Sequence, residues 1–153
     1  MVTLPKMTQQ ELEAYLENAV QTLADELERA NGWSSERSRA ASLESFNAIL
    51  RDRVVDSPNQ FLRTIVADGE KVGVLWFGVR AENEAVVWDI LVHPLHRHKG
   101  HGRAAMKAME AELRTMKVHS VVLNVFAHNL TALKMYSSLG YTPVATKMRK
   151  QLR

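Results

Sequence analysis

The chain has 153 residues, of which 46% are hydrophobic and 24% charged, and this composition fits one globular domain over residues 1–153 and excludes a disordered chain. Its formal net charge is +3, and it contains no cysteine, which excludes disulfides, thiolate metal sites and a cysteine nucleophile and agrees with a cytoplasmic protein. No stretch approaches the ~20 apolar residues of a membrane-spanning helix, and the first twenty residues lack the pattern of a secretory signal, so we expect no membrane association.

The spacing of apolar residues changes from helical to strand-like near residue 60, and the expected elements follow this change. The first half predicts a short edge strand at 2–5, a helix from the capping box Thr8–Glu11 to Gly32, a second helix from Ser34 or Ser35, and strands at 61–67 and 72–79 about the turn Asp68-Gly69. The second half predicts a buried strand at 85–92, a helix at about 101–117, a strand at 120–126, a short helix from Asn129 to Gly140, and a last strand at 141–149. Antiparallel strands followed by two strand–helix units predict a mixed α/β sheet.

Charge is distributed unevenly along the chain. Residues 1–92 carry a net charge of −6, and residues 93–153 carry +9. This asymmetry favours an anionic ligand on the C-terminal half and a cationic one near the N-terminal half. Solvated helix faces that differ in sign would give the same totals, so both interpretations stay open.

A basic, glycine-containing loop, Arg97-His98-Lys99-Gly100-His101-Gly102, separates the buried strand from the next helix. Gly100 and Gly102 let the backbone turn and approach a ligand without a Cβ in the way. The free N–H groups and the dipole at the start of the helix favour an anion there, which suits a pyrophosphate. The loop lacks the Gly-Lys-Ser/Thr of a Walker loop and the third glycine of a Rossmann fingerprint. Positive charge comes from Arg97, Lys99 and Arg103.

Three motifs, in this order and spacing, resemble those of the GNAT acetyltransferase superfamily. They are Val92-His93-Pro94, the loop at 97–102, and Asn129-x-x-Ala132-x-x-x-Tyr136-x-x-x-Gly140-Tyr141. The resemblance covers residues 85–141 and implies the GNAT fold, with mostly antiparallel N-terminal strands, splayed parallel central strands and flanking helices. It also implies an N-acetyltransferase that moves an acetyl group from acetyl-CoA to a primary amine.

The resemblance places acetyl-CoA between the strands at 85–92 and 120–126. There the backbone of Ile90, Leu91 and Val92 would pair with pantetheine, and one N–H would face the thioester oxygen, where negative charge develops. Asn129 would bond the pantetheine chain, although an asparagine there is also a plain helix cap, and both roles can hold. The pyrophosphate would be held by the loop residues Arg97, His98, Lys99, Gly100, His101, Gly102 and Arg103.

The resemblance also implies the catalytic groups. Tyr136 matches the family's usual general acid, and its alternative role is that of a buried core tyrosine. Relatives with a glutamate as general base would place it at Asn124, whose amide cannot take a proton. Asp89 is the preferred base, acting directly, through water, or by holding a cationic amine, and its alternative role is a structural carboxylate. His93 and Glu84 are weaker candidates.

Other functions fit the sequence less well. The four histidines at 93, 96, 98 and 101 straddle a turn, with Asp89 as the only nearby carboxylate, so we expect no metal site. The basic half lacks interleaved aromatics and a DNA-reading motif, so we expect no nucleic-acid partner. A GNAT-like module that binds acyl-CoA without catalysis remains the alternative to an enzyme.

The acceptor is the part of the reaction that the sequence defines least. The first helix is rich in acidic residues, which favours a cationic small-molecule or peptide amine as the acceptor. No cysteine and no serine nucleophile arrangement is present, so we expect direct attack of the amine on the thioester in a ternary complex. A homodimer is compatible with the sequence, which does not identify the acceptor.

Overall fold

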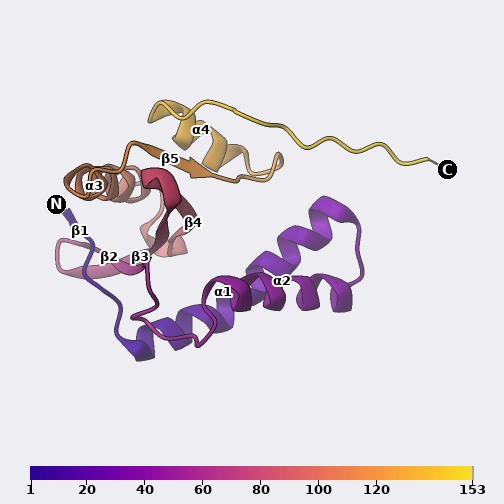
Figure 1. Ribbon diagram of the computed structural model, residues 1–153, viewed down its shortest axis with the longest axis horizontal. Coiled ribbons are helices and arrows are strands. Elements are labelled where there is room, and N and C mark those ends of the chain that lie inside the picture. Colours follow the sequence, from indigo (N-terminus) through magenta and orange to yellow (C-terminus); the bar gives the residue numbers. More distant parts are fainter. Residues whose placement is uncertain (153) are drawn as a thin grey trace.

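The computed structural model describes residues 1–152 as a five-stranded mixed sheet with helices on both faces (Figure 1). The strands lie in chain order: β1 (Val2–Thr3), β2 (Gln60–Ala67), β3 (Glu70–Arg80), β4 (Glu84–Val92) and β5 (Ser120–Leu123). The helices are α1 (Gln9–Asn31), α2 (Ser35–Ile49), α3 (His101–Thr115) and α4 (Leu130–Ser138), with single 3-10 turns at Ala81–Asn83 and Pro94–His96. The first four strands pair antiparallel and β4 pairs parallel with β5, which confirms the predicted mixed α/β sheet.

The two faces of the sheet are buried in separate cores. Leu75 and Phe77 of β3 pack with α3 and with residues of α4, whereas Trp76 between them packs with α1 and α2. This division follows from the two-residue period of a strand, which sends alternate side chains to opposite faces. A central strand covered on both faces therefore reads as an almost continuous apolar run.

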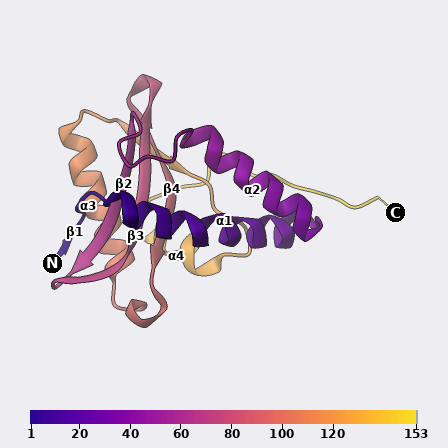
Figure 2. The ribbon, with the colours of Figure 1, turned by 90° about the horizontal axis from the view of Figure 1, so that it is seen from below.

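Helix α1 begins and ends where the sequence predicts. Thr8 and Glu11 form the reciprocal capping box, and Gly32 adopts a left-handed conformation at φ 68° after the last turn. The buried residues of α1 all lie between Leu12 and Ala24, because the helix crosses the strands and then projects past the sheet together with α2 (Figure 2). Within residues 1–152, no helix combines the length and apolarity needed to cross a bilayer.

The strand predicted at 141–149 does not form, so that prediction is wrong for the single chain. Instead, residues 142–152 extend away from the sheet, past the end of the α1–α2 hairpin (Figures 1 and 2). The Tyr141 N–H donates to the Tyr136 carbonyl, which turns the chain away at the end of α4. A strand needs a neighbouring strand to satisfy its backbone hydrogen bonds, and within residues 1–152 this segment has none.

Candidate active site

The site is built around a place where β4 and β5 part. Their parallel ladder runs from the pair Glu84–Ser120 to the pair Val87–Leu123 and stops there, although β4 continues to Val92. At the same point Trp88 is an extra residue in β4, because Trp76 of β3 pairs with Asp89 and the next residue pairs with Val87. Such a bulge bends and twists a strand, so the second half of β4 diverges from β5.

The bulge leaves backbone groups of β4 without a strand on one side. The His93 N–H donates to the Val72 carbonyl at 2.8 Å, which fixes the alternation of hydrogen-bonded and non-bonded pairs along β3 and β4. By that alternation Leu91 pairs with β3, whereas the N–H and C=O groups of Ile90 and Val92 point toward the gap. Two of them already have partners: Arg97 Nε donates to the Val92 carbonyl at 2.8 Å, and the Ile90 N–H donates to the Asp89 carboxylate. The Ile90 carbonyl and the Val92 N–H remain open to the gap.

The basic loop turns the chain at the mouth of this gap. His98 and Gly100 have positive φ angles of 62° and 81°, and residues 97–100 are exposed. α3 starts at His101 without a side-chain cap, so its first N–H groups remain free for a ligand. A Cβ on Gly100 would meet nothing within 4 Å, whereas one on Gly102 would lie 3.2 Å from the Met135 sulfur. Gly100 therefore serves the turn, and Gly102 serves the packing of α3 against α4.

The cations predicted for the loop do not all point the same way. Lys99 is exposed beside Gly100, and Arg97 folds back onto β4. Arg103 Nη1 donates to the Ser138 hydroxyl of α4 at 2.5 Å, so this guanidinium links α3 to α4. All three side chains place positive charge at one end of the gap. β4 orients Arg97, and α4 orients Arg103.

Asp89 lies directly after the bulge and receives a hydrogen bond from α1. The Tyr15 hydroxyl donates to Asp89 Oδ2 at 2.6 Å. Burial raises the pKa of the Asp89 carboxyl, and hydrogen bonds from the Tyr15 hydroxyl and the Ile90 N–H oppose that rise. Burial and the negative charge of Asp89 raise the pKa of Tyr15 well above its ordinary value, so Tyr15 stays a hydrogen-bond donor.

Tyr136 approaches Asp89 from α4. Its ring packs edge-on against Tyr141 at a centroid distance of 5.9 Å, in the core that α3 covers. Burial and the nearby charge of Asp89 raise the pKa of Tyr136 to about 12. Within residues 1–152 its hydroxyl has no hydrogen-bond partner, so this protonated phenol remains available to a ligand. Asp89 thus accepts a hydrogen bond from a tyrosine of α1, and its charge acts on a tyrosine of α4.

The remaining predicted residues divide between the gap and the scaffold. Asn129 Oδ1 accepts from the Ala132 N–H at 3.2 Å, which confirms the helix cap and leaves its NH₂ group unused by that bond. Asn124 follows the paired part of β5 at the start of the gap. Glu84 lies at the closed end of the β4–β5 ladder, away from Asp89, and its carboxylate forms an ion pair with Arg80 at 2.6 Å.

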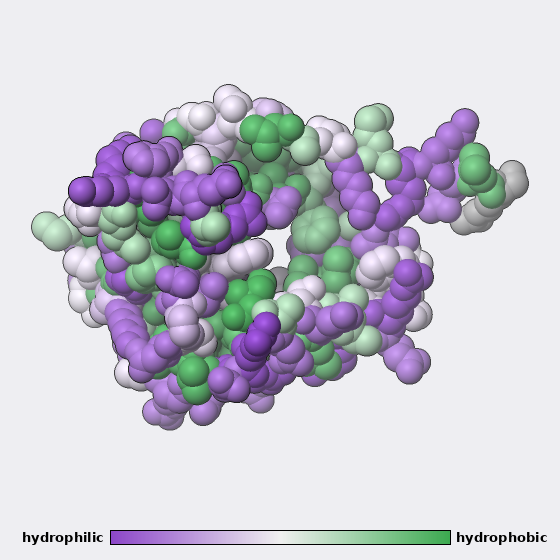
Figure 3. Space-filling model, in the orientation of Figure 1, coloured by the Kyte–Doolittle hydropathy of each residue, from purple (hydrophilic) through white to green (hydrophobic). Residues whose placement is uncertain are grey.

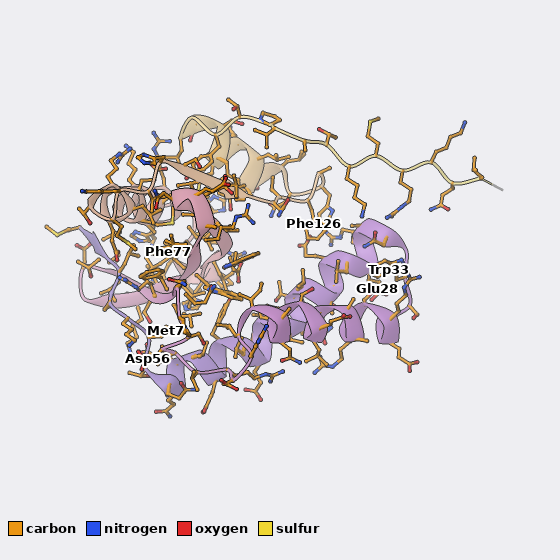
Figure 4. The ribbon with its side chains drawn as sticks, viewed as in Figure 1. Met7, Glu28, Trp33, Asp56, Phe77 and Phe126 are labelled. Atoms are coloured by element: carbon orange, nitrogen blue, oxygen red, sulfur yellow. The ribbon has the colours of Figure 1, made fainter. Side chains whose placement is uncertain are left out.

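A hollow separates the sheet from the α1–α2 hairpin, and hydrophobic side chains gather on its walls (Figure 3). Phe126, in the loop after β5, lies at the rim of the hollow on the side of the hairpin (Figure 4). Its ring stacks on that of His128 at a centroid distance of 5.5 Å. His128 Nε2 in turn contacts the Glu26 carboxylate of α1, which ties the β5–α4 loop to the hairpin. Trp88 of the bulge remains 37% exposed.

The four histidines of the loop region do not converge. His96 Nδ1 lies 3.9 Å from Glu70 of β3, and His98 and His93 are exposed. In the part of the chain that the structure describes, no group of three histidine, aspartate or glutamate side chains is placed to hold a metal ion.

Two features of the site escape the sequence analysis. Tyr15 falls on the apolar stripe of α1, where its ring is a core residue like any other, and only the fold brings its hydroxyl to Asp89. The pair of Glu26 and His128 joins residues 102 positions apart, which no local pattern reveals. The one available signal for Tyr15 is that a buried tyrosine hydroxyl usually requires a hydrogen-bond partner.

Comparison with known proteins agrees with this geometry. The model of the GNAT acetyltransferase family matches residues 20–141. The uncharacterized N-acetyltransferase YdgE of Bacillus subtilis is 31% identical over 155 residues, covering 98% of each chain. The crystal structure of YycN from B. subtilis, itself named an uncharacterized N-acetyltransferase, superposes with a TM-score of 0.93 at 28% identity, covering 100% of this chain and 99% of that one.

A more distant structure shares the fold. The PaiA N-acetyltransferase of Thermoplasma acidophilum, solved in complex with coenzyme A, has a TM-score of 0.68 at 16% identity, covering 96% of this chain and 93% of that chain. The family model matches most of the chain, and the relative YdgE aligns over nearly its whole length. The chain therefore belongs to the GNAT acetyltransferase family.

Proposed function

We propose that this protein is an N-acetyltransferase that transfers an acetyl group from acetyl-CoA to a primary amine by direct attack within a ternary complex. The observation that carries the proposal is the parting of β4 and β5 after the pair Val87–Leu123. It brings free backbone groups of β4, a basic loop and the side chains of Asp89 and Tyr136 to one opening.

The residues around the gap suit acetyl-CoA, which would supply the acetyl group as an activated thioester. Gly100 lets the loop turn with open space beside it, and the uncapped start of α3 offers N–H donors to a pyrophosphate. The Val92 N–H and the Ile90 carbonyl present a strand-like donor and acceptor, to which an extended pantetheine amide chain is complementary. An N–H in this row would stabilise the negative charge that develops on the thioester oxygen during attack.

Asp89 is suited to receive the proton of the amine. A primary amine must lose a proton to form an amide, and a carboxylate whose pKa is raised by burial is a stronger base than an ordinary one. The Tyr15 hydroxyl holds the carboxylate by a 2.6 Å hydrogen bond and so limits its rotation. Asp89 could act directly or through a water molecule.

Tyr136 is suited to donate to the departing sulfur. At a pKa of about 12 the phenol is fully protonated near neutral pH, but proton transfer to a thiolate of ordinary pKa ~8.5 would be uphill. Part of that rise comes from the negative charge of Asp89. When Asp89 takes the proton of the amine its charge disappears, so the phenol becomes a better donor at the step that needs it.

The side of the hollow formed by the α1–α2 hairpin favours a cationic amine as the acceptor. α1 carries Glu26, whose carboxylate contacts His128 at the rim of the hollow, and Trp88 of the bulge is partly exposed. A carboxylate and an aromatic face both attract an ammonium group. The hydrophobic walls add a preference for an amine with an apolar portion, either a small molecule or a peptide.

Gly100→Ala tests whether the loop binds acetyl-CoA. The new Cβ is strained at φ 81°, at a cost of about 1–2 kcal/mol, so the loop should relax and acetyl-CoA affinity should fall about tenfold or more by calorimetry. Gly32→Ala is the matched control, because Gly32 has φ 68° and equally open space but caps α1. It should lower stability alone. If the parent protein does not bind acetyl-CoA, the proposal is refuted. If Gly100→Ala binds acetyl-CoA as tightly as the parent does, the loop is only a turn and not part of the binding site.

Asp89→Asn tests the base. The amide keeps the shape of the carboxylate, so acetyl-CoA binding should persist while kcat/KM falls by about 10²-fold or more. In the parent, kcat/KM should decline as pH falls through the raised pKa of Asp89, and this acidic limb should vanish in the variant. Glu84→Gln, at the paired end of β4, is the control and should keep its rate. A fully active Asp89→Asn would make Asp89 a structural residue.

Tyr136→Phe tests the acid. The ring still packs against Tyr141, so acetyl-CoA affinity should change little, and kcat should drop by about 10²-fold because the proton donor is lost. Tyr141→Phe is the matched control, since the Tyr141 hydroxyl is bound to Glu110 at 3.0 Å. Steady-state rates across pH 6–9 measure both. If the two variants are equally active, Tyr136 is a core residue only.

A further inference from the structure

The sheet ends at β5 with a short apolar edge that carries neither charge nor proline. Within residues 1–152, β5 pairs only with β4, and its other side faces no strand. Residues 120–123 read Ser-Val-Val-Leu, with no charge and no proline, and Val121, Val122 and Leu123 each keep part of their surface exposed. Exposed apolar edges of this kind invite pairing with another strand, and natural edge strands carry lysines or prolines that prevent it.

Residues 142–152, the tail, have the pattern of the missing strand. The three large apolar side chains fall on even positions and are almost fully exposed: Val144 at 90%, Met148 at 87% and Leu152 at 85%. Lys147 and Arg149 fall on the opposite face of an extended tail, so all the large apolar side chains share one face, which also carries Lys150 near its end. Pro143 stands at its start, where a strand tolerates proline. Placed on β5, the tail would end the sheet with a protected edge.

The tail does not reach the β5 edge of its own chain. Tyr141 is tied to α4 through its N–H and to Glu110 of α3 through its hydroxyl. Farther on, Arg149 donates to the Ala30 carbonyl at 3.0 Å and to Asn31 Oδ1 at 2.6 Å, at the far end of α1. Between these anchors the tail runs clear of the body, and Figure 3 shows it projecting from the molecular surface.

We propose that the tail pairs as a strand with the β5 edge of a second copy of this chain, and that the second copy returns its own tail to the first. Each chain has one bare edge and one unpaired strand, so the exchange is reciprocal and closes as a twofold dimer. It satisfies the backbone groups of both segments and buries the apolar face of both tails. It also restores the last strand that the sequence predicts at 141–149, supplied by the partner.

Molecular mass in solution tests the exchange first. The parent chain of 17.3 kDa should elute as a dimer of about 35 kDa by light scattering. The double variant Val144→Lys, Met148→Lys makes the apolar face of the tail basic, and should elute as a monomer with an unchanged far-ultraviolet spectrum. Leu95→Lys is the control, because Leu95 is equally exposed at 88% but lies outside the tail, and it should remain a dimer. A monomeric parent, or a dimeric double variant, would overturn the proposal.

Cross-linking distinguishes an exchanged tail from one that folds back. The chain has no cysteine, so Ser120→Cys on β5 can carry one photoactivated cross-linker. Chains so labelled are refolded with an excess of unmodified, isotope-labelled chains, irradiated and digested. Mass spectrometry should find the β5 peptide that carries the cross-linker joined to isotope-labelled tail peptides. Cross-links only to tails of the same unlabelled chain, or none to any tail, would refute the exchange.

Discussion

The early end of the β4–β5 ladder is the constraint on which the site depends. With Trp88 inserted in β4, the two strands part after Val87, and the Ile90 carbonyl and the Val92 N–H are left without a partner inside a folded sheet. Unpaired backbone groups in a protein interior are costly unless something binds them. A ligand with its own amide groups is therefore the natural complement of this gap. The same parting lets Tyr136, from the core under α3 and α4, influence a carboxylate that α1 holds from the other face.

The uneven charge of the chain maps onto the two sides of this opening. The basic loop and α3 come from the half with net charge +9, and the α1–α2 hairpin comes from the half with net charge −6. One side therefore suits the phosphates of a nucleotide and the other a cationic amine. The contact between Glu26 and His128 joins the two halves of the chain at the rim of the hollow.

Local patterns predict most of the fold and only part of the site. The capping box at Thr8, the turn at Asp68-Gly69 and the loop at 97–102 are short-range signals, and each element they mark is confirmed within a few residues. The role of Tyr15 in the site could not be predicted from the sequence, because its hydroxyl contacts Asp89 only once α1 packs across the sheet. Alternation predicts the strand at 141–149, but alternation cannot say which chain provides the partner strand. Long-range pairing is decided by the whole fold.

The most direct test of the central claim is hydrogen exchange of individual β4 amides with and without acetyl-CoA. The register leaves the Val92 N–H open to the gap and pairs the Leu91 N–H with β3. Saturating acetyl-CoA should therefore slow exchange at Val92, while Leu91, already protected, changes much less. Unchanged exchange at Val92 with acetyl-CoA bound would contradict the account, because the parted strands would then not be the binding site.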